Sequence, residues 1–201
     1  MSARAVAHPV FCSFREYVHL EQDSNLKHEY VAGQMYAMSV GTPKHALLAA
    51  VIIGELTVAL RSGRCRVYSS DLRVRVRKTD MSTYPDVTVV CGPLKPDPED
   101  KNSVTNPIVL VEVMSESTEE YDRGGKFEHY KHIPSLREYV LVSQREPVIE
   151  VRERTRSGWT SRVGRPGKQV VLGSVGVTLD VDAIYRAATE VAPGRARTRR
   201  G

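Results

Sequence analysis

Ile108-Val109-Leu110-Val111-Glu112-Val113-Met114 is an apolar run with a single carboxylate in it. A continuous apolar run of this length is typical of a strand that is covered on both faces of a sheet. A charged side chain in such a strand is costly unless it is paired or binds a metal ion. Glu112 is therefore both a residue of a predicted buried strand and a candidate site residue.

Asp86 is a second carboxylate of this kind, in the run Tyr84-Pro85-Asp86-Val87-Thr88-Val89-Val90. On neighbouring strands, the two carboxylates would repel each other, and a divalent cation between them would remove the repulsion. Side chains alternate along a strand, so Glu112 and Met114 share a face, and the Val113 carbonyl could add an oxygen ligand. Oxygen ligands suit Mg²⁺, and no His or Cys spacing in the chain is typical of zinc. Taken alone, Asp86 could instead begin a strand or cap a turn.

Lys126 could supply the positive charge that phosphodiester hydrolysis needs near the attacked phosphate. It lies on a helix expected over residues 117–132, directly after the Glu112 strand. Lys126 is four residues from both Asp122 and Tyr130, so all three share one helix face. The alternative is a surface ion pair between Asp122 and Lys126, which would stabilise the helix by only ~0.3–0.5 kcal/mol.

Further helices and strands alternate along the chain. Ser13 and Glu16 form a capping box that begins a short helix. Thr42 and Pro43 begin a longer helix that runs to about Arg61, and its apolar residues nearly surround it, which predicts burial. Strands are expected over 26–31, 34–40, 65–78, 139–142 and 148–151, followed by a peripheral hairpin of 159–163 with 169–172 and a last helix over 179–188.

This order predicts one α/β (α+β) domain over residues 1–190, built on a mixed central sheet, and a disordered basic tail over residues 191–201. In the strand expected over 65–78, apolar and basic residues alternate. The alternation predicts a solvated basic face, or alternatively contacts with phosphate, for Arg73, Arg75 and Arg77.

Composition limits the class of protein. The chain has 201 residues, 41% of them hydrophobic, and a net charge of +5. Residues 1–150 carry 18 basic and 20 acidic groups, whereas residues 151–201 carry 11 basic and 4 acidic groups. Because the excess of basic groups is confined to residues 151–201, the high pI of the chain is weak support for nucleic-acid binding. The scattered Cys12, Cys65 and Cys91 predict free thiols in a cytoplasmic protein. No signal peptide is expected, because the N-terminus lacks an apolar h-region. No membrane association is expected, because the longest apolar stretch, 46–60, contains Glu55 and is too short to span a bilayer.

Several segments resemble the PD-(D/E)XK nuclease superfamily, and more closely the bacterial Uma-two family of restriction-type endonucleases. The similarity covers roughly residues 13–185. The matching segments are Glu29-Tyr30-Val31-Ala32-Gly33, Ser39 with His45, Pro85-Asp86-Val87, Val111-Glu112-Val113-Met114-Ser115-Glu116-Ser117-Thr118, Asp122 with Lys126 and Tyr130, and Ile133-Pro134-Ser135-Leu136-Arg137-Glu138-Tyr139.

The resemblance implies a restriction-endonuclease-like core of three layers, with a mixed central sheet flanked by helices. It implies Mg²⁺ or Mn²⁺ bound by Asp86 and Glu112, with Glu29 as a further acidic residue of the catalytic site. Met114 stands in the slot of the motif lysine, so Lys126 is expected to replace that lysine. The implied activity is hydrolysis of phosphodiester bonds in DNA by a metal-dependent endonuclease, and the implied assembly is a homodimer.

A nuclease-fold module that has lost cleavage and binds nucleic acid or protein is the competing interpretation, because Met114 carries no charge and the body is near neutral. Glu29 could be an active-site acid or a solvated strand residue. His45 lies near a helix start, where a structural or capping role is expected. The two interpretations differ in whether Glu29, Asp86, Glu112 and Lys126 converge on one cleft.

Overall fold

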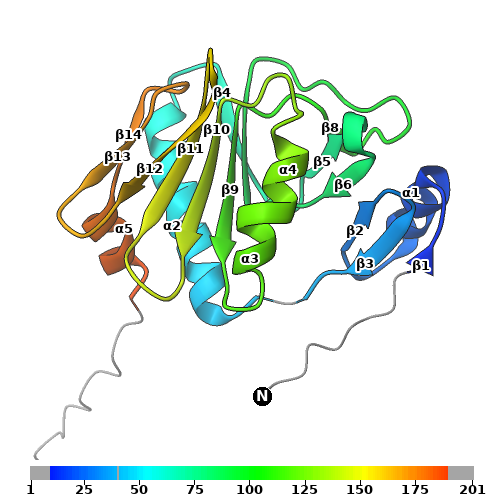
Figure 1. Cartoon of the computed structure of the whole chain (residues 1–201), viewed down its shortest axis with the longest axis horizontal. Helices are drawn as coiled ribbons and strands as arrows, with labels where there is room; N and C mark the ends of the chain where they lie inside the picture. The colour runs from blue at the N-terminus through cyan, green and yellow to red at the C-terminus, as the bar shows by residue number, and fades with distance from the viewer. Residues whose placement is uncertain (1–9, 40, 190–201) are drawn as a thin grey trace, which may run out of the picture.

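The computed structural model describes residues 10–39 and 41–189. Two expectations, the strand end at Val40 and the tail over 191–201, lie outside the described residues. The centre of the fold is a six-stranded sheet (Figure 1). Its strand order is β12 (Gly158–Gly164), β11 (Ile149–Thr155), β10 (Glu138–Ser143), β9 (Val109–Met114), β7 (Val87–Cys91) and β4 (Cys65–Ser69). Only β9 and β10 pair in parallel, so the sheet is mixed, as predicted.

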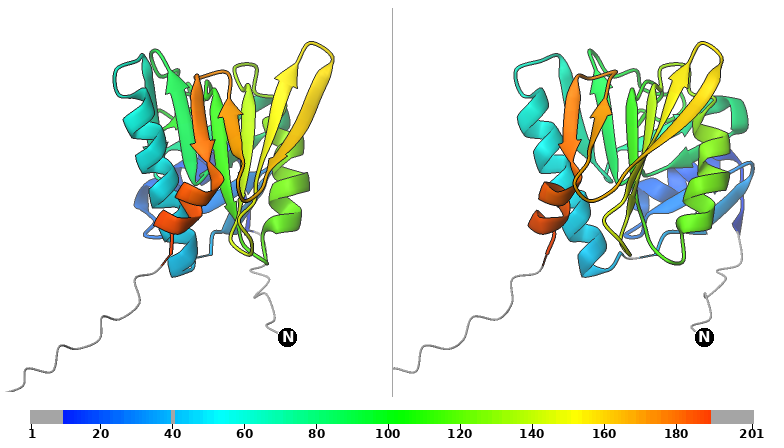
Figure 2. Two further views of the ribbon diagram at one scale, coloured as in Figure 1. Left: turned by 90° about the vertical axis from the view of Figure 1, so that its left-hand side faces the viewer. Right: turned by 60° about the vertical axis from the view of Figure 1, so that its left-hand side comes forward.

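The alternation of β9 separates two apolar clusters. Val109, Val111 and Val113 pack with α2 (Pro43–Leu60), and α5 (Val181–Ala187) joins the same cluster. Leu110 and Met114 pack on the opposite face. That face is covered by one continuous helical stretch, formed by α3 (Glu119–Tyr121), a π-helical segment (Asp122–Lys126) and α4 (Phe127–Tyr130). Figure 2 shows the sheet between these helical layers, which confirms the predicted three-layer core.

Helix α2 begins as predicted and buries less of its surface than predicted. The Thr42 hydroxyl accepts a hydrogen bond from the His45 amide, and Pro43 is the first helical residue. Its buried residues form one stripe, Leu48, Ile52, Leu56 and Leu60, whereas Val58 is 61% exposed. The expectation of burial all round is wrong, because the sheet covers only one side. By length and composition alone this helix could cross a membrane, and the core helix of a soluble protein passes the same test.

A second six-stranded sheet lies beside the first, which sequence reasoning missed. Its order is β1 (Val10–Phe11), β3 (Gln34–Ala37), β2 (His28–Val31), β6 (Met81–Thr83), β5 (Arg73–Val76) and β8 (Ser103–Val104). Helix α1 (Phe14–Asp23) begins with the predicted capping box at Ser13 and packs on β2. Ala32 and Gly33 both have positive φ values, so they form the predicted tight turn between β2 and β3.

The single strand expected over 65–78 is wrong. A turn that follows Ser69 divides it into β4 and β5, which belong to different sheets. The expected solvated face is wrong for Arg73 and Arg75, whereas Arg77 is 56% exposed and pairs with Asp97. Arg73 is 4% exposed and pairs with Asp100, and Arg75 is 8% exposed and pairs with Asp80. Their burial excludes contact with phosphate in this structure.

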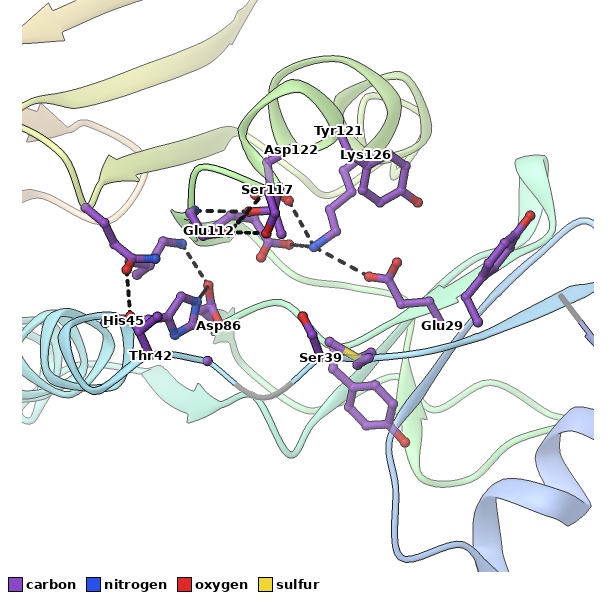
Figure 3. Close-up of a pocket in the computed structure, with 18 of the residues that line it drawn as sticks. Glu29, Ser39, Thr42, His45, Asp86, Glu112, Ser117, Tyr121, Asp122 and Lys126 are labelled. Carbon is purple, nitrogen blue, oxygen red and sulfur yellow. Dashed lines mark hydrogen bonds and ion pairs between the residues drawn. The ribbon is translucent and has the colours of Figure 1, made fainter. Parts of the chain in front are cut away.

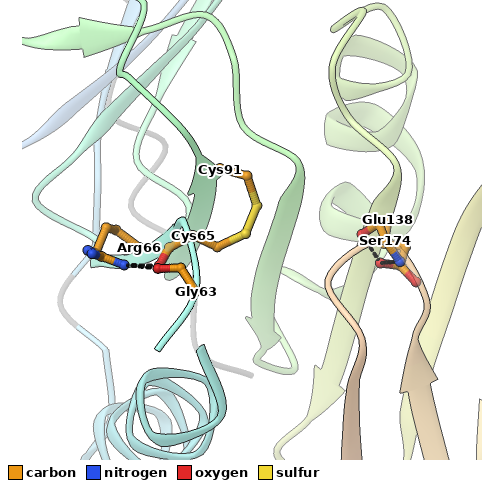
Figure 4. The surroundings of a disulfide bond; sticks show 6 residues. All are labelled: Gly63, Cys65, Arg66, Cys91, Glu138 and Ser174. Atoms are coloured by element: carbon orange, nitrogen blue, oxygen red, sulfur yellow. Dashed lines mark hydrogen bonds between the residues drawn. A yellow bond between two sulfur atoms is a disulfide. The ribbon is translucent and has the colours of Figure 1, made fainter. Parts of the chain in front are cut away.

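The C-terminal elements pair differently from the prediction. β12 forms a hairpin with β11, whereas β13 (Gln169–Leu172) pairs with β14 (Val177–Asp180). The expected hairpin between 159–163 and 169–172 is therefore wrong, and Leu179 belongs to a strand. Glu138, on β10, is fully buried and accepts hydrogen bonds from the amides of Gly173 and Ser174 at 2.8 and 3.3 Å. Figure 4 shows Glu138 beside Ser174. Glu138 ties the β13–β14 unit to the central sheet.

A disulfide joins Cys65 and Cys91, so the expectation of free thiols is wrong for these two residues (Figure 4). They are direct partners in the antiparallel register of β4 and β7, which brings residues far apart in sequence together. Cys12 keeps a free thiol.

Candidate active site

Lys126 lies at the centre of a group of carboxylates, on the face of the central sheet that α3, the π-helical segment and α4 cover (Figure 3). Its ammonium nitrogen is 3.1 Å from Glu112 Oε1, 3.2 Å from Asp122 Oδ1 and 3.4 Å from Glu29 Oε1. The Lys126 side chain is only 8% exposed, and those of Glu112 and Asp122 are 4% and 3% exposed. The pair of Asp122 and Lys126 is therefore a buried interaction, and the surface interpretation of it is wrong.

The π-helical segment positions Lys126 and Asp122. The hydrogen-bonding pattern from Asp122 to Lys126 is that of a π-helix, and such single-turn bulges occur frequently at functional sites. Gly125 makes this turn possible, because a Cβ atom there would lie 2.5 Å from the Tyr121 ring. Gly124 and Gly125 thus lie where the helix type changes within one continuous helical stretch.

Two hydroxyl groups hold the acidic residues in place. The Tyr130 hydroxyl donates to Glu112 Oε1 at 2.8 Å, and the Thr83 hydroxyl donates to Glu29 Oε1 at 2.5 Å. Tyr130 is fully buried, which fixes its orientation. The predicted face of Asp122, Lys126 and Tyr130 therefore points at the Glu112 strand.

Asp86 lies immediately before β7, at the same end of the sheet as Glu112. Its Oδ2 accepts a hydrogen bond from the Val113 amide at 2.7 Å and is 3.1 Å from His45 Nε2. The Val113 contact joins Asp86 to the residue that follows Glu112, so β7 and β9 bring the two carboxylates to one place. The interpretation of Asp86 as only a strand start or turn cap does not account for its contact with His45.

The protonation equilibria reflect burial and crowding. Burial raises the pKa of Glu112 well above its usual value, and the Asp122 and Asp86 carboxylates raise it further, against the effect of Lys126. Burial also raises the pKa of Asp122. Burial acts to lower the pKa of Lys126, but the carboxylates of Glu112 and Glu29 prevail and hold it well above its usual value. The hydrogen bond with Asp86 raises the pKa of His45.

These groups line a cavity of about 640 Å³, which also includes Thr42, Tyr121 and Gln144 among its lining residues. Four carboxylates, Glu29, Asp86, Glu112 and Asp122, line it together with one ammonium group, Lys126, and two imidazoles, His45 and His129. The charge is therefore predominantly acidic. An acidic cavity repels a phosphate group unless a cation is bound in it.

The donor atoms fit a hard divalent cation. Asp86 Oδ1 and Glu112 Oε2 accept no hydrogen bond from any residue that the structure describes. Within residues 10–39 and 41–189, no three His, Cys, Asp or Glu side chains form a ready ligand set. A cation here would therefore have two carboxylates and keep several waters, which is the coordination that Mg²⁺ prefers.

His45 is the residue whose place in the site sequence reasoning missed. The prediction gave it a structural or capping role, but its Nε2 contacts Asp86 while its backbone amide bonds the Thr42 cap. A hydrogen-bonded partner that orients a metal ligand is a common feature of metal sites. The segment Ser39 to His45 in the family resemblance was the available signal.

The fold and this constellation of residues place the chain in the class of restriction-endonuclease-like nucleases. The chain belongs to the Uma2 family, described as "Putative restriction endonuclease", whose model matches residues 14–182. Membership of this family confirms the resemblance seen in the sequence, and the fold is consistent with the wider PD-(D/E)XK superfamily.

The chain is also similar to two further proteins and to a solved structure. A protein of Synechocystis sp. described as uncharacterized is 38% identical over 175 residues, covering 85% of this chain and 90% of that protein. A second uncharacterized Synechocystis protein is 29% identical over 129 residues, covering 64% of this chain and 73% of its own length. A crystal structure from Anabaena variabilis, described as "a putative nuclease belonging to DUF820", shares the fold with a TM-score of 0.69 and 16% identity, covering 83% of this chain and 93% of that one.

Proposed function

We propose that this protein is an endonuclease that hydrolyses phosphodiester bonds of DNA and depends on Mg²⁺ or Mn²⁺. The observation that carries the proposal is the position of the Lys126 ammonium, 3.1 Å from Glu112 at the wall of an acidic cavity. The lysine that the sequence lacks at Met114 is thereby supplied from a neighbouring helix.

Each residue has a distinct part in this proposal. Asp86 and Glu112 hold the cation, with the Val113 carbonyl as a further oxygen ligand. When bound, such a cation polarises a phosphate oxygen and lowers the pKa of a bound water. His45 orients Asp86, and Tyr130 orients Glu112. Lys126 stabilises the negative charge that develops on the attacked phosphate, and Glu29 and Asp122 fix the position of its ammonium group.

Supercoiled plasmid DNA tests the proposal, because a single cut converts it to the relaxed form. We expect the wild type to nick plasmid in Mg²⁺ and to lose this activity in EDTA. We expect Glu112→Gln to reduce the rate at least ~100-fold, since it removes one of two ligand charges. The matched control is Glu116→Gln, which changes an exposed residue four positions further on.

The outcome separates the two interpretations of the family resemblance. Equal nicking by the wild type and Glu112→Gln would contradict the proposed endonuclease. DNA association without metal-dependent cleavage, unchanged in Asp86→Asn, would favour the module that binds and does not cut. The homodimer and the cytoplasmic location stay predictions.

A further inference from the structure

One wall of the cavity carries hydrogen-bond donors instead of carboxylates. It is formed by Gly41, Thr42, His45 and Gln144, where the N-terminus of α2 meets the end of β10. Helix α2 has 18 residues, so its first turn presents the positive end of a full-length helix dipole. Pro43 has no N–H and the His45 amide bonds to Thr42, so the Lys44 amide is the one in this turn without a partner among the described residues. Both features favour an anion.

Gln144 provides an independent indication of a ligand at this wall. It is 9% exposed, and its Oε1 accepts a hydrogen bond from the Thr42 hydroxyl at 2.9 Å. Its Nε2 is buried and has no hydrogen-bond partner among the residues that the structure describes. Because Thr42 also accepts from the His45 amide, its hydroxyl hydrogen is free for Gln144 Oε1, which leaves the amide hydrogens of Gln144 unused. A buried donor without a partner is costly, and an oxyanion in the cavity would satisfy it.

The neighbouring charges extend this wall away from the carboxylates. Lys44 and Arg145 are each adjacent in sequence to a residue of the wall, and both line a second hollow of about 340 Å³ together with Glu146. Both are exposed, and neither forms an ion pair with a described residue. Two exposed cations next to this wall suit a chain of phosphates that runs past it.

We infer that Gln144 and the N-terminus of α2 form a subsite for a phosphodiester of the DNA. This phosphodiester lies on the cleaved strand, next to the phosphodiester that is hydrolysed. The inference rests on the proposed function for the identity of the strand. Gln144 donates to a phosphate oxygen, the free amide of Lys44 adds a second donor, and the side chains of Lys44 and Arg145 contact the phosphates beyond. Gln144 is a binding residue in this account and takes no part in bond cleavage.

Nitrogen-15 NMR of the Glu112→Gln protein tests the subsite without cleavage. The probes are inorganic phosphate and a thymidine tetranucleotide that has internal phosphodiesters and no terminal phosphate. We expect both to shift the Gln144 side-chain resonances, which are identified by their absence from the spectrum of Gln144→Glu. If only inorganic phosphate shifts them, the subsite takes free anions and the inference is wrong.

The variant Gln144→Glu keeps an acceptor for Thr42 and replaces the amide donor with a negative charge. We expect it to weaken tetranucleotide binding about tenfold or more, as the loss of a hydrogen bond to a charged group implies. The control Gln169→Glu alters an exposed glutamine on β13 and should bind as before. Gln144→Leu, with circular dichroism to verify folding, gives a second measurement should the charge at 144 disturb the fold.

Unchanged affinity in both Gln144 variants, or no binding at all, would overturn the subsite. Plasmid nicking with unchanged affinity would leave the proposed endonuclease intact while the subsite fails. Gln144-dependent binding without any nicking would support the subsite in a protein that does not cut.

Discussion

Lys126 is both the proposed stabiliser of charge and a structural residue, because it is buried among Glu29, Glu112 and Asp122. Breaking a buried ion pair by removing one partner leaves uncompensated charges. A lysine whose only role was solubility would lie at the surface and would not contact three carboxylates. Function and stability therefore depend on the same ammonium group.

We expect Lys126→Met to reduce DNA cleavage by ~10²–10³-fold and to lower the free energy of unfolding by about 3–5 kcal/mol. Single-turnover nicking and urea denaturation measure the two effects. Lys131→Met is the control, since among the described residues Lys131 forms its ion pair with the exposed Glu128 alone. A Lys126→Met protein that is folded and fully active would disprove the role of Lys126.

His45 offers a second prediction at the scale of the residue. His45→Ala removes the Nε2 contact with Asp86, and we expect Mn²⁺ affinity, measured by calorimetry, to fall ~10–100-fold. His45→Gln keeps a nitrogen donor at a similar reach and should lose less. If the two variants bind Mn²⁺ as the wild type does, Asp86 does not need His45 for its orientation.

Among the elements, the π-helical segment has the closest connection to the site, because it carries both Asp122 and Lys126. Gly124 and Gly125 have different surroundings despite being neighbours. A Cβ atom at Gly125 would collide with the Tyr121 ring, whereas one at Gly124 would meet no atom within 4 Å. Alanine substitutions at these two positions therefore distinguish the effect of packing on stability from the effect of helix propensity.

We expect Gly125→Ala to destabilise the protein by ~1–3 kcal/mol through overpacking and to impair cleavage by shifting Lys126. Gly124→Ala should be neutral or stabilising by up to ~1 kcal/mol, since alanine favours helix. Urea denaturation of both variants gives the comparison. Equal stability would mean that the Tyr121 ring moves aside freely.

Strand alternation and helix spacing were sufficient to predict half of the site. The alternation along β9 placed Glu112 correctly, and the four-residue spacing placed Asp122, Lys126 and Tyr130 on one face. Neither rule predicts which strands pair over long separations. Nor does either rule predict how helices and loops pack against distant strands. The contact of His45 with Asp86 and the burial of Arg73 beside Asp100 depend on such packing, so they were missed.

Across the whole molecule, long-range pairing also explains the disulfide and the second sheet. Cys65 and Cys91 meet only because β4 pairs with β7 in one particular register. The sequence could not reveal that 65–78 is split between two sheets, because both parts have alternating side chains and the turn between them lacks glycine and proline.

We expect the disulfide to stabilise the protein by ~2–4 kcal/mol, since it closes a loop between residues 26 positions apart. Urea denaturation of Cys12→Ser protein, with and without reductant, measures this contribution and leaves only the Cys65–Cys91 pair to respond. The double variant Cys65→Ser/Cys91→Ser should be insensitive to reductant. If both proteins respond equally to reductant, the response does not come from the disulfide.

The central claim is that Asp86 and Glu112 together bind a divalent cation beside Lys126. Anomalous diffraction from crystals that contain Mn²⁺ tests it most directly, because it locates the ion without reference to activity. We expect an Mn²⁺ peak within coordination distance of oxygens from both Asp86 and Glu112, and we expect this peak to be lost in Glu112→Gln. Mn²⁺ bound elsewhere, or no ion between these carboxylates at saturating concentration, would contradict the account.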